Sequence, residues 1–310
     1  DDVESRGLGD VYKRQDMNTV EYKNYGKCAV FVRGGTKVMV TLDVGPRIIW
    51  FGTEDFNFLN EDLDRNVNKG GDYFDENYGK GTTWYLYGGH RVWKSPEDLE
   101  TYTPDNFPVE CKEREWGGSF TCRAGLRIDH TLDIELAEDG SLTVLNTLTN
   151  KGEARELSVW GLTVAAKGGT LVLPLNDPVD DLNPVYNVVR WPYNDPEDER
   201  LCVGEKFLTL RQTDRPEAIK IGTFAKKGEA YYAIGDKVMK WECVPEDGVY
   251  GDFWCNFESY TNAHILEVEW LSRRVTLGKG ESFTMPEKWS VAELDSLPEV
   301  AERVKAAAKC

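Results

Sequence analysis

The residues best suited to chemistry are gathered between positions 86 and 106. His90 is one of only three histidines, and it is followed closely by Arg91, Trp93 and Glu97 in the run Leu86-Tyr87-Gly88-Gly89-His90-Arg91-Val92-Trp93-Lys94-Ser95-Pro96-Glu97. The two glycines allow close backbone approach, the arginine offers a planar fork of donors, and the aromatic rings offer flat apolar faces. These groups match the hydroxyl rims and C–H faces of sugars, so the run predicts a carbohydrate-contacting loop. The alternative is a strand end with a buried histidine and a structural tryptophan.

Three other segments, and the end of the same run, supply further candidates. Tyr102 is followed by Pro104 and the pair Asp105-Asn106, which is typical of a turn and could also contact a ligand. Trp191 lies in an aromatic and basic string that either lines a cleft or packs on itself. Glu258 and Tyr260 lie in a strand-like run late in the chain. Glu97 follows Ser95-Pro96, so it is either a substrate contact or an acidic residue at the start of a helix.

Composition narrows the functional classes. The net charge of −17 over 310 residues disfavours nucleic acids and anionic membrane surfaces, and it is neutral toward uncharged sugars. No apolar run approaches the ~20 residues of a membrane-spanning helix. The seven cysteines are scattered and form no CxxC motif, which predicts free thiols in a reducing compartment and hence a cytoplasmic location.

Motifs for cofactors and metals are missing from the sequence. There is no P-loop, no GxGxxG after a strand and no GxSxG elbow. The three histidines are too far apart for a local metal motif. A metal site formed in three dimensions by His90, His264 and Glu258 is left open.

The spacing of apolar residues predicts an all-β chain. Short β-rich runs recur about every ten residues between glycine-rich turns, which indicates a sandwich or barrel. The expected strands are residues 28–32, 37–43, 47–51, 127–136, 141–149, 156–165, 170–174, 207–212, 219–224, 230–234, 237–242, 264–271 and 282–290. Residues 297–309 predict a short C-terminal helix. We expect residues 1–16 to be a non-native or disordered tail and residues 17–310 to be one domain. The long segments 52–80 and 175–200 are expected to wall a cleft at one end of the sheets.

The ordered set of motifs resembles the galactose-mutarotase-like superfamily, whose fold is a large antiparallel β-supersandwich. Within it the chain looks most like an uncharacterised bacterial family of the DUF4380 type, close to the aldose 1-epimerases. The resemblance spans roughly residues 25–290, and the segments that carry it are Gly45-Pro46-Arg47-Ile48-Ile49, Tyr87-Gly88-Gly89-His90-Arg91-Val92-Trp93, Tyr102-Thr103-Pro104-Asp105-Asn106, Asn150-Lys151-Gly152, Trp160-Gly161-Leu162-Thr163, Gly168-Gly169, Trp191-Pro192-Tyr193 and Phe257-Glu258-Ser259-Tyr260-Thr261.

The resemblance implies acid–base chemistry on a sugar. In the epimerases a late glutamate is the general base and a histidine in a mid-chain strand is the general acid. Glu258 matches the base, but the matching mid-chain segment, residues 158–163, contains no histidine. We therefore expect His90 to act as a displaced acid. Arg91, Trp93, Glu97, Tyr102, Asp105, Asn106, Trp191 and Tyr260 are expected to bind the substrate.

Two other functions share the same predicted cleft. One is a glycoside hydrolase or polysaccharide lyase that uses Glu97 and Glu258 as paired carboxylates. The other is a non-catalytic carbohydrate-binding protein, which the missing histidine favours. The expected ligand is in each case a sugar or oligosaccharide. Mutarotation needs no cofactor, so none is expected, and the oligomeric state is left open.

Overall fold

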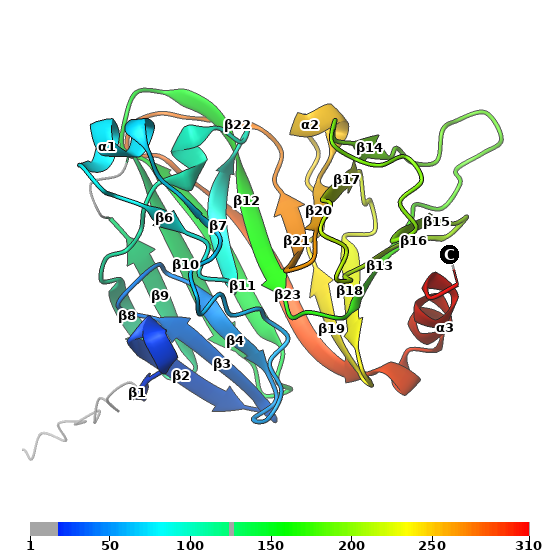
Figure 1. Ribbon diagram of the computed structural model, residues 1–310, viewed down its shortest axis with the longest axis horizontal. Helices are drawn as coiled ribbons and strands as arrows, with labels where there is room; N and C mark the ends of the chain where they lie inside the picture. The colour runs from blue at the N-terminus through cyan, green and yellow to red at the C-terminus, as the bar shows by residue number, and fades with distance from the viewer. Residues whose placement is uncertain (1–17, 124–126, 310) are drawn as a thin grey trace, which may run out of the picture.

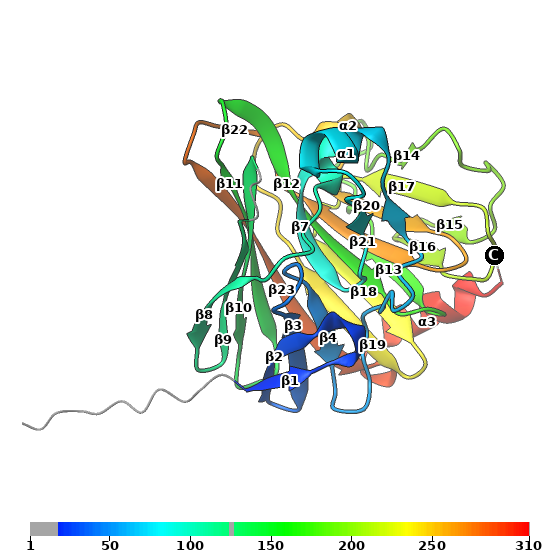
Figure 2. The same ribbon diagram turned by 60° about the vertical axis from the view of Figure 1, so that its left-hand side comes forward.

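The structure is a computed structural model that describes residues 18–123 and 127–309. The tail predicted at residues 1–16 lies outside these ranges. Over the described part, two large antiparallel sheets face each other (Figures 1 and 2). This architecture confirms the predicted all-β supersandwich.

The first sheet has eleven strands within the described ranges. Its order is β1-β2-β3-β4-β7-β12-β21-β20-β17-β14, and β22 pairs separately with β12. The strands are β1 (Thr19–Glu21), β2 (Lys27–Arg33), β3 (Thr36–Thr41), β4 (Ile48–Gly52), β7 (His90–Ser95), β12 (Arg155–Ala165), β14 (Val189–Arg190), β17 (Ile219–Thr223), β20 (Phe257–Thr261), β21 (Leu266–Leu271) and β22 (Val275–Leu277).

The second sheet has ten strands within the same ranges, in the order β15-β16-β13-β18-β19-β23-β11-β10-β9-β8. The strands are β8 (Glu110–Arg114), β9 (Gly117–Cys122), β10 (Ile128–Leu136), β11 (Leu142–Asn150), β13 (Thr170–Pro174), β15 (Leu201–Val203), β16 (Phe207–Arg211), β18 (Glu229–Ile234), β19 (Lys237–Glu242) and β23 (Ser282–Glu293). A small ribbon of β5 (Asn68–Lys69) and β6 (Trp84–Tyr85) stands apart from both sheets.

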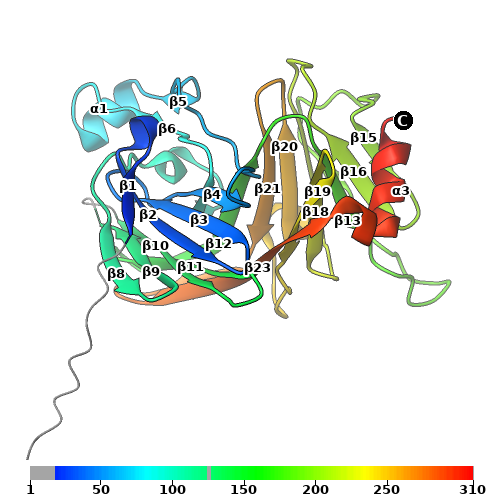
Figure 3. The same ribbon diagram turned by 90° about the horizontal axis from the view of Figure 1, so that it is seen from below.

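The helices are short and lie around the edges. They are η1 (Lys23–Tyr25), α1 (Asp72–Tyr78), η2 (Leu99–Tyr102), α2 (Gly251–Trp254), η3 (Leu294–Ser296) and α3 (Pro298–Ala307). Helix α3 begins at a proline, as the sequence predicts, and packs against β13 and β16 on the side of the molecule away from β1 (Figure 3). No helix in the described ranges is both long enough and apolar enough to cross a membrane.

Alternation along the strands sets two opposite faces on the first sheet. One face joins the second sheet in the main core, where Val92, Val159 and Trp270 meet residues such as Trp241 and Trp289. The other face is covered by α1 and β6, and there Trp93, Trp160, Leu162 and Val164 pack with Phe74 and Trp84. Because neighbouring residues in a strand point to opposite faces, a single position decides which environment a side chain enters.

The expected strands all have counterparts in the structure, with small shifts at their ends. Residues 90–95 form a central strand, β7, where the sequence predicted a contact loop, so the alternative of a strand is correct there. Strands β8 and β9 were not predicted. Cys202 is disulfide-bonded, so the prediction of free thiols is wrong for that residue.

Candidate functional site

A polar cavity opens on the outer face of the first sheet. Its volume is about 450 Å³. Three segments and the sheet itself form its walls, and the lining residues are Pro96, Glu97, Asp98, Leu99, Tyr102, Trp160, Trp191, Lys220, Asp252 and Glu258. Four residues predicted for the site, Glu97, Tyr102, Trp191 and Glu258, are therefore brought together here.

The floor of the cavity is a buried charge cluster. Lys220 Nζ lies 2.8 Å from an oxygen of Glu258 and 3.0 Å from an oxygen of Glu269. Strand pairing explains the contact: Glu258 lies directly opposite Glu269 on β21, and Lys220 is diagonal to it on β17. Trp160 Nε1 donates to Glu269 at 3.1 Å. One oxygen of Glu258, Oε1, is buried and has no hydrogen-bond partner in the protein.

Burial controls the protonation of this cluster. It raises the pKa of Glu258 to about 8, although Lys220 opposes the shift. Burial also raises the pKa of Glu269. Burial acts on Lys220 in the opposite sense, but the two carboxylates outweigh it and raise the pKa of the ammonium well above its ordinary value. The lysine therefore stays charged, and the Glu258 carboxyl group is partly protonated at neutral pH.

The opposite wall is the turn around η2, which is firmly anchored. Asp98 and Thr101 form a capping box, and Lys94 Nζ contacts Asp98 at 2.6 Å. Arg155 holds Glu100 with two bonds, at 3.0 and 2.5 Å. These contacts fix the neighbouring residues Glu97 and Tyr102, whose hydroxyl donates to the Glu97 carboxylate.

Aromatic rings flank the lysine on both sides. Lys220 Nζ lies 4.9 Å from the ring centroids of Trp160 and Trp191. Gly222, which lies opposite Glu258, leaves room for Cys255, because a Cβ there would come within 2.6 Å of the Cys255 sulfur. The cavity thus combines flat aromatic faces with carboxylates. The C–H face of a sugar can stack on the aromatic rings, and its hydroxyls can donate hydrogen bonds to the carboxylates.

His90 is placed elsewhere. It is fully buried on the core face of β7, with Nδ1 2.8 Å from Thr163 Oγ1 and Nε2 2.8 Å from Asn146 Oδ1. Asn146 in turn donates to Glu287 at 2.7 Å. Burial lowers the pKa of His90 to about 3. The histidine does not line the cavity, because position 90 points to the face opposite that of Arg91 and Trp93.

The remaining predicted ligands lie outside the cavity lining. Arg91 is buried with its guanidinium 4.9 and 4.8 Å from the rings of Trp84 and Trp93, and burial lowers its pKa. Trp93 is buried among those rings, 5.3 Å from Trp160. Arg91 and Trp93 therefore pack next to Trp160, which lines the cavity, and do not line it themselves.

Asp105, Asn106 and Tyr260 are also outside the lining. Asp105 is buried in a two-bond ion pair with Arg47, one bond of which is 3.0 Å long. Asn106 accepts from the Tyr87 hydroxyl at 2.7 Å. Tyr260 is half-buried on the same face as Glu258, two residues along β20, and accepts from Asn262 at 3.1 Å.

Sequence reasoning missed Lys220, Glu269 and Asp252. Two signals pointed to the first pair. Lys220 interrupts an apolar strand, Ile219-Lys220-Ile221, and Glu267 and Glu269 alternate with apolar residues in β21. Charged residues at alternate positions in an otherwise buried strand indicate a polar face that needs partners.

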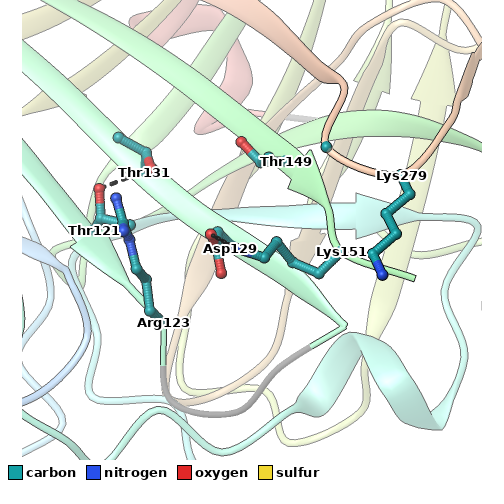
Figure 4. A pocket seen from close by; sticks show the side chains of 8 residues that line it. Thr121, Arg123, Asp129, Thr131, Thr149, Lys151 and Lys279 are labelled. Carbon is teal, nitrogen blue, oxygen red and sulfur yellow. Dashed lines mark hydrogen bonds and ion pairs between the residues drawn. The ribbon is translucent and has the colours of Figure 1, made fainter.

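Other hollows in the described residues are less suited to chemistry. One lies on the outer face of the second sheet and is lined by Thr121, Arg123, Asp129, Thr131, Thr149, Lys151, Lys279 and Gly280 (Figure 4). Its one carboxylate is paired with Lys151 at 3.2 Å. Within residues 18–123 and 127–309, no three His, Cys, Asp or Glu side chains are grouped to hold a metal ion, so the metal site left open at His90, His264 and Glu258 does not form.

Comparison with known proteins identifies the fold. A putative aldose 1-epimerase from Escherichia coli K12 is similar with a TM-score of 0.54 and 10% identity, over 86% of this chain and 99% of that one. A galactose mutarotase-like protein from Clostridium acetobutylicum is similar with a TM-score of 0.50 and 13% identity, over 89% of this chain and 98% of that one. No family model matches the chain, and no curated protein matches it. The chain therefore has the galactose mutarotase-like fold, and the resemblance to the DUF4380-type family stays a prediction.

Proposed function

We propose that the chain is a carbohydrate-converting enzyme of the aldose 1-epimerase type, with its reaction centre at Glu258. The observation that carries the proposal is the free, buried Glu258 Oε1 in a cavity that also holds Lys220 and two tryptophan rings. A buried carboxylate oxygen without a hydrogen-bond partner is costly unless a ligand completes it, even where Lys220 binds the other oxygen. The fold similarity to mutarotase-like proteins supports the same class.

The proposed mechanism removes a proton from the anomeric hydroxyl and adds a proton to the ring oxygen. Glu258, in its carboxylate form, takes the proton from the anomeric hydroxyl. The bond between the anomeric carbon and the ring oxygen then breaks, and the ring oxygen receives a proton from a water molecule at the open side of the cavity. Rotation about the bond between the new carbonyl carbon and its neighbouring carbon, followed by closure through the reverse steps, gives the other anomer. A pKa of about 8 makes Glu258 a stronger base than an ordinary carboxylate while leaving part of it ionised at neutral pH.

The surrounding residues position this chemistry. Lys220 holds the Glu258 side chain and keeps part of it ionised, and Trp160 and Trp191 offer stacking faces. In this proposal His90 has no catalytic part, since its ring nitrogens are both bonded inside the core. Glu97, which accepts from the Tyr102 hydroxyl, has in this proposal the part of a substrate ligand on the opposite wall.

The test is exchange NMR of the anomeric signals of a panel of aldoses with the full chain. We expect faster α/β exchange for at least one neutral sugar, and loss of that acceleration in Glu258→Gln with sugar binding retained. Binding without acceleration in the wild type would instead identify a carbohydrate-binding protein. Release of shorter or unsaturated products from polysaccharides would identify a hydrolase or lyase.

A further inference from the structure

Several exposed apolar side chains line the cavity or lie within two residues of a position that lines it. Beside Asp252, which lines the cavity, Phe253 is 83% exposed and Trp254 is 56% exposed. On other parts of the rim, Tyr193 is 51% exposed and Leu99 is 50% exposed. Large apolar side chains left in solvent beside a cavity mark a surface that binds something.

The backbone of α2 (Gly251–Trp254) has an unusual conformation at the exposed residues Phe253 and Trp254. Asp252, Phe253 and Trp254 have φ values of 44°, 58° and 70°, which is the left-handed region. Bulky residues seldom adopt it, because their Cβ then lies too close to the neighbouring backbone. Such strain is concentrated at ligand-binding segments.

Neighbouring contacts hold this strained turn in place. The Asn187 amide donates to the Phe253 carbonyl at 3.0 Å, and the Cys255 N–H donates to the Gly251 carbonyl at 3.1 Å. Cys255, directly after the turn, is fully buried. Figures 1 and 2 show α2 beside β14 and β17, at the same end of the sheets. The aromatic rings are therefore displayed from a fixed base and not from a free loop.

We propose that the site takes the end of a neutral oligosaccharide, with the units beyond the reacting sugar stacked on Phe253 and Trp254. This inference rests on the proposed function, because it extends the same cavity. Continuity with the cavity argues for a glycan. The apolar side chains are spread around a polar, carboxylate-lined opening, whereas a protein interface has an apolar centre and a polar rim.

The experiment measures dissociation constants for malto-, cello-, chito- and galacto-oligosaccharides of one to four units with the full chain. Each stacked ring is expected to raise affinity about fivefold, so with two rings we expect affinity in one series to rise about thirtyfold from one to three units. In Phe253→Ala, and likewise in Trp254→Ala, one stacking face is lost and this gain is expected to fall to about fivefold. Phe107→Ala is the matched control, since Phe107 is 44% exposed and outside the cavity lining, and the gain should persist there.

The outcomes separate the two proposals. Binding of single sugars with no gain in affinity for longer chains would refute the oligosaccharide inference and leave the proposed function standing. No binding of any sugar would refute both. A change in oligomeric state in Phe253→Ala or Trp254→Ala, without an effect on chain-length dependence, would show that the rim binds a second copy and would overturn the inference.

Discussion

Replacing Lys220 with methionine should destabilise the protein in a strongly pH-dependent way. At 2.8 Å from Glu258 and 3.0 Å from Glu269, the ammonium attracts each carboxylate by about 6 kcal/mol at an effective dielectric constant of about 20. The cost of removing these charges from water cancels much of that attraction. Removal of one partner from a buried pair therefore costs about 3–5 kcal/mol, and we expect this loss in the free energy of unfolding near pH 9.

The loss should shrink as the pH falls, because protons replace the missing positive charge. In the variant the pKa of the carboxyl pair rises further above its value in the unfolded chain. A raised folded-state pKa gives stability that is present at low pH and lost as the pH rises through that pKa. Each proton taken up by the folded variant recovers about 1.4 kcal/mol per pH unit.

The assay is urea unfolding from pH 5 to pH 9, with Lys240→Met as the matched control. Lys240 also lies between two glutamates, at 2.9 Å from Glu229 and 3.2 Å from Glu242, but its side chain is 23% exposed and that of Lys220 is 7% exposed. A solvated pair of this kind is worth at most about 1 kcal/mol. Equal losses in the two variants, or a loss in Lys220→Met that does not change with pH, would refute the reasoning about the buried cluster.

Three further predictions follow from the same geometry. His90→Ala should lower the free energy of unfolding by about 1–3 kcal/mol, because Asn146 and Thr163 lose their hydrogen-bond partner. The rate of anomeric exchange per folded molecule should stay within about twofold of the wild-type rate, and loss of exchange in this variant would instead show that His90 is catalytic. Burial raises the pKa of Glu287 to about 7, so wild-type stability should fall as the pH rises from 5 to 8, and Glu287→Gln should flatten that fall in thermal unfolding; an unchanged slope would contradict it. The cavity lining holds more acidic side chains than basic ones, so it should repel an anionic sugar. At low salt a uronate should therefore bind at least about tenfold more weakly than its neutral parent sugar, and equal affinities in a titration would contradict this cavity as the binding site.

The sequence was sufficient for the fold because alternation is a local signal. Residues 128–136 and 142–150 alternate between buried and more exposed positions, and the chain folds them into β10 and β11 as predicted. Glu258 was predicted for another reason, because the resemblance to the epimerases matches their late glutamate to this position. Trp191, Glu97 and Tyr102 were recognised by their chemical type.

The errors came from pairing between distant segments. The run at His90 was interpreted as a loop, so the alternation that turns His90 into the core and Trp93 to the outer face was not applied. Lys220 acquires its role only when β17, β20 and β21 lie side by side. The pattern of residues within one segment does not reveal which strand that segment pairs with or in which register, because strand pairing depends on the whole sheet.

The most direct test of the central claim is the rate of catalysed anomeric exchange as a function of pH, in the wild type and in Glu258→Gln. If Glu258 is the base, the wild-type rate should rise with pH as the carboxyl group ionises, reach half its maximum near pH 8 and level off about one pH unit higher, following its raised pKa. In Glu258→Gln the exchange should no longer be accelerated, and its rate should no longer show this rise with pH. An acceleration that survives in Glu258→Gln with an unchanged pH profile would contradict the account, because the reaction would then have its centre elsewhere.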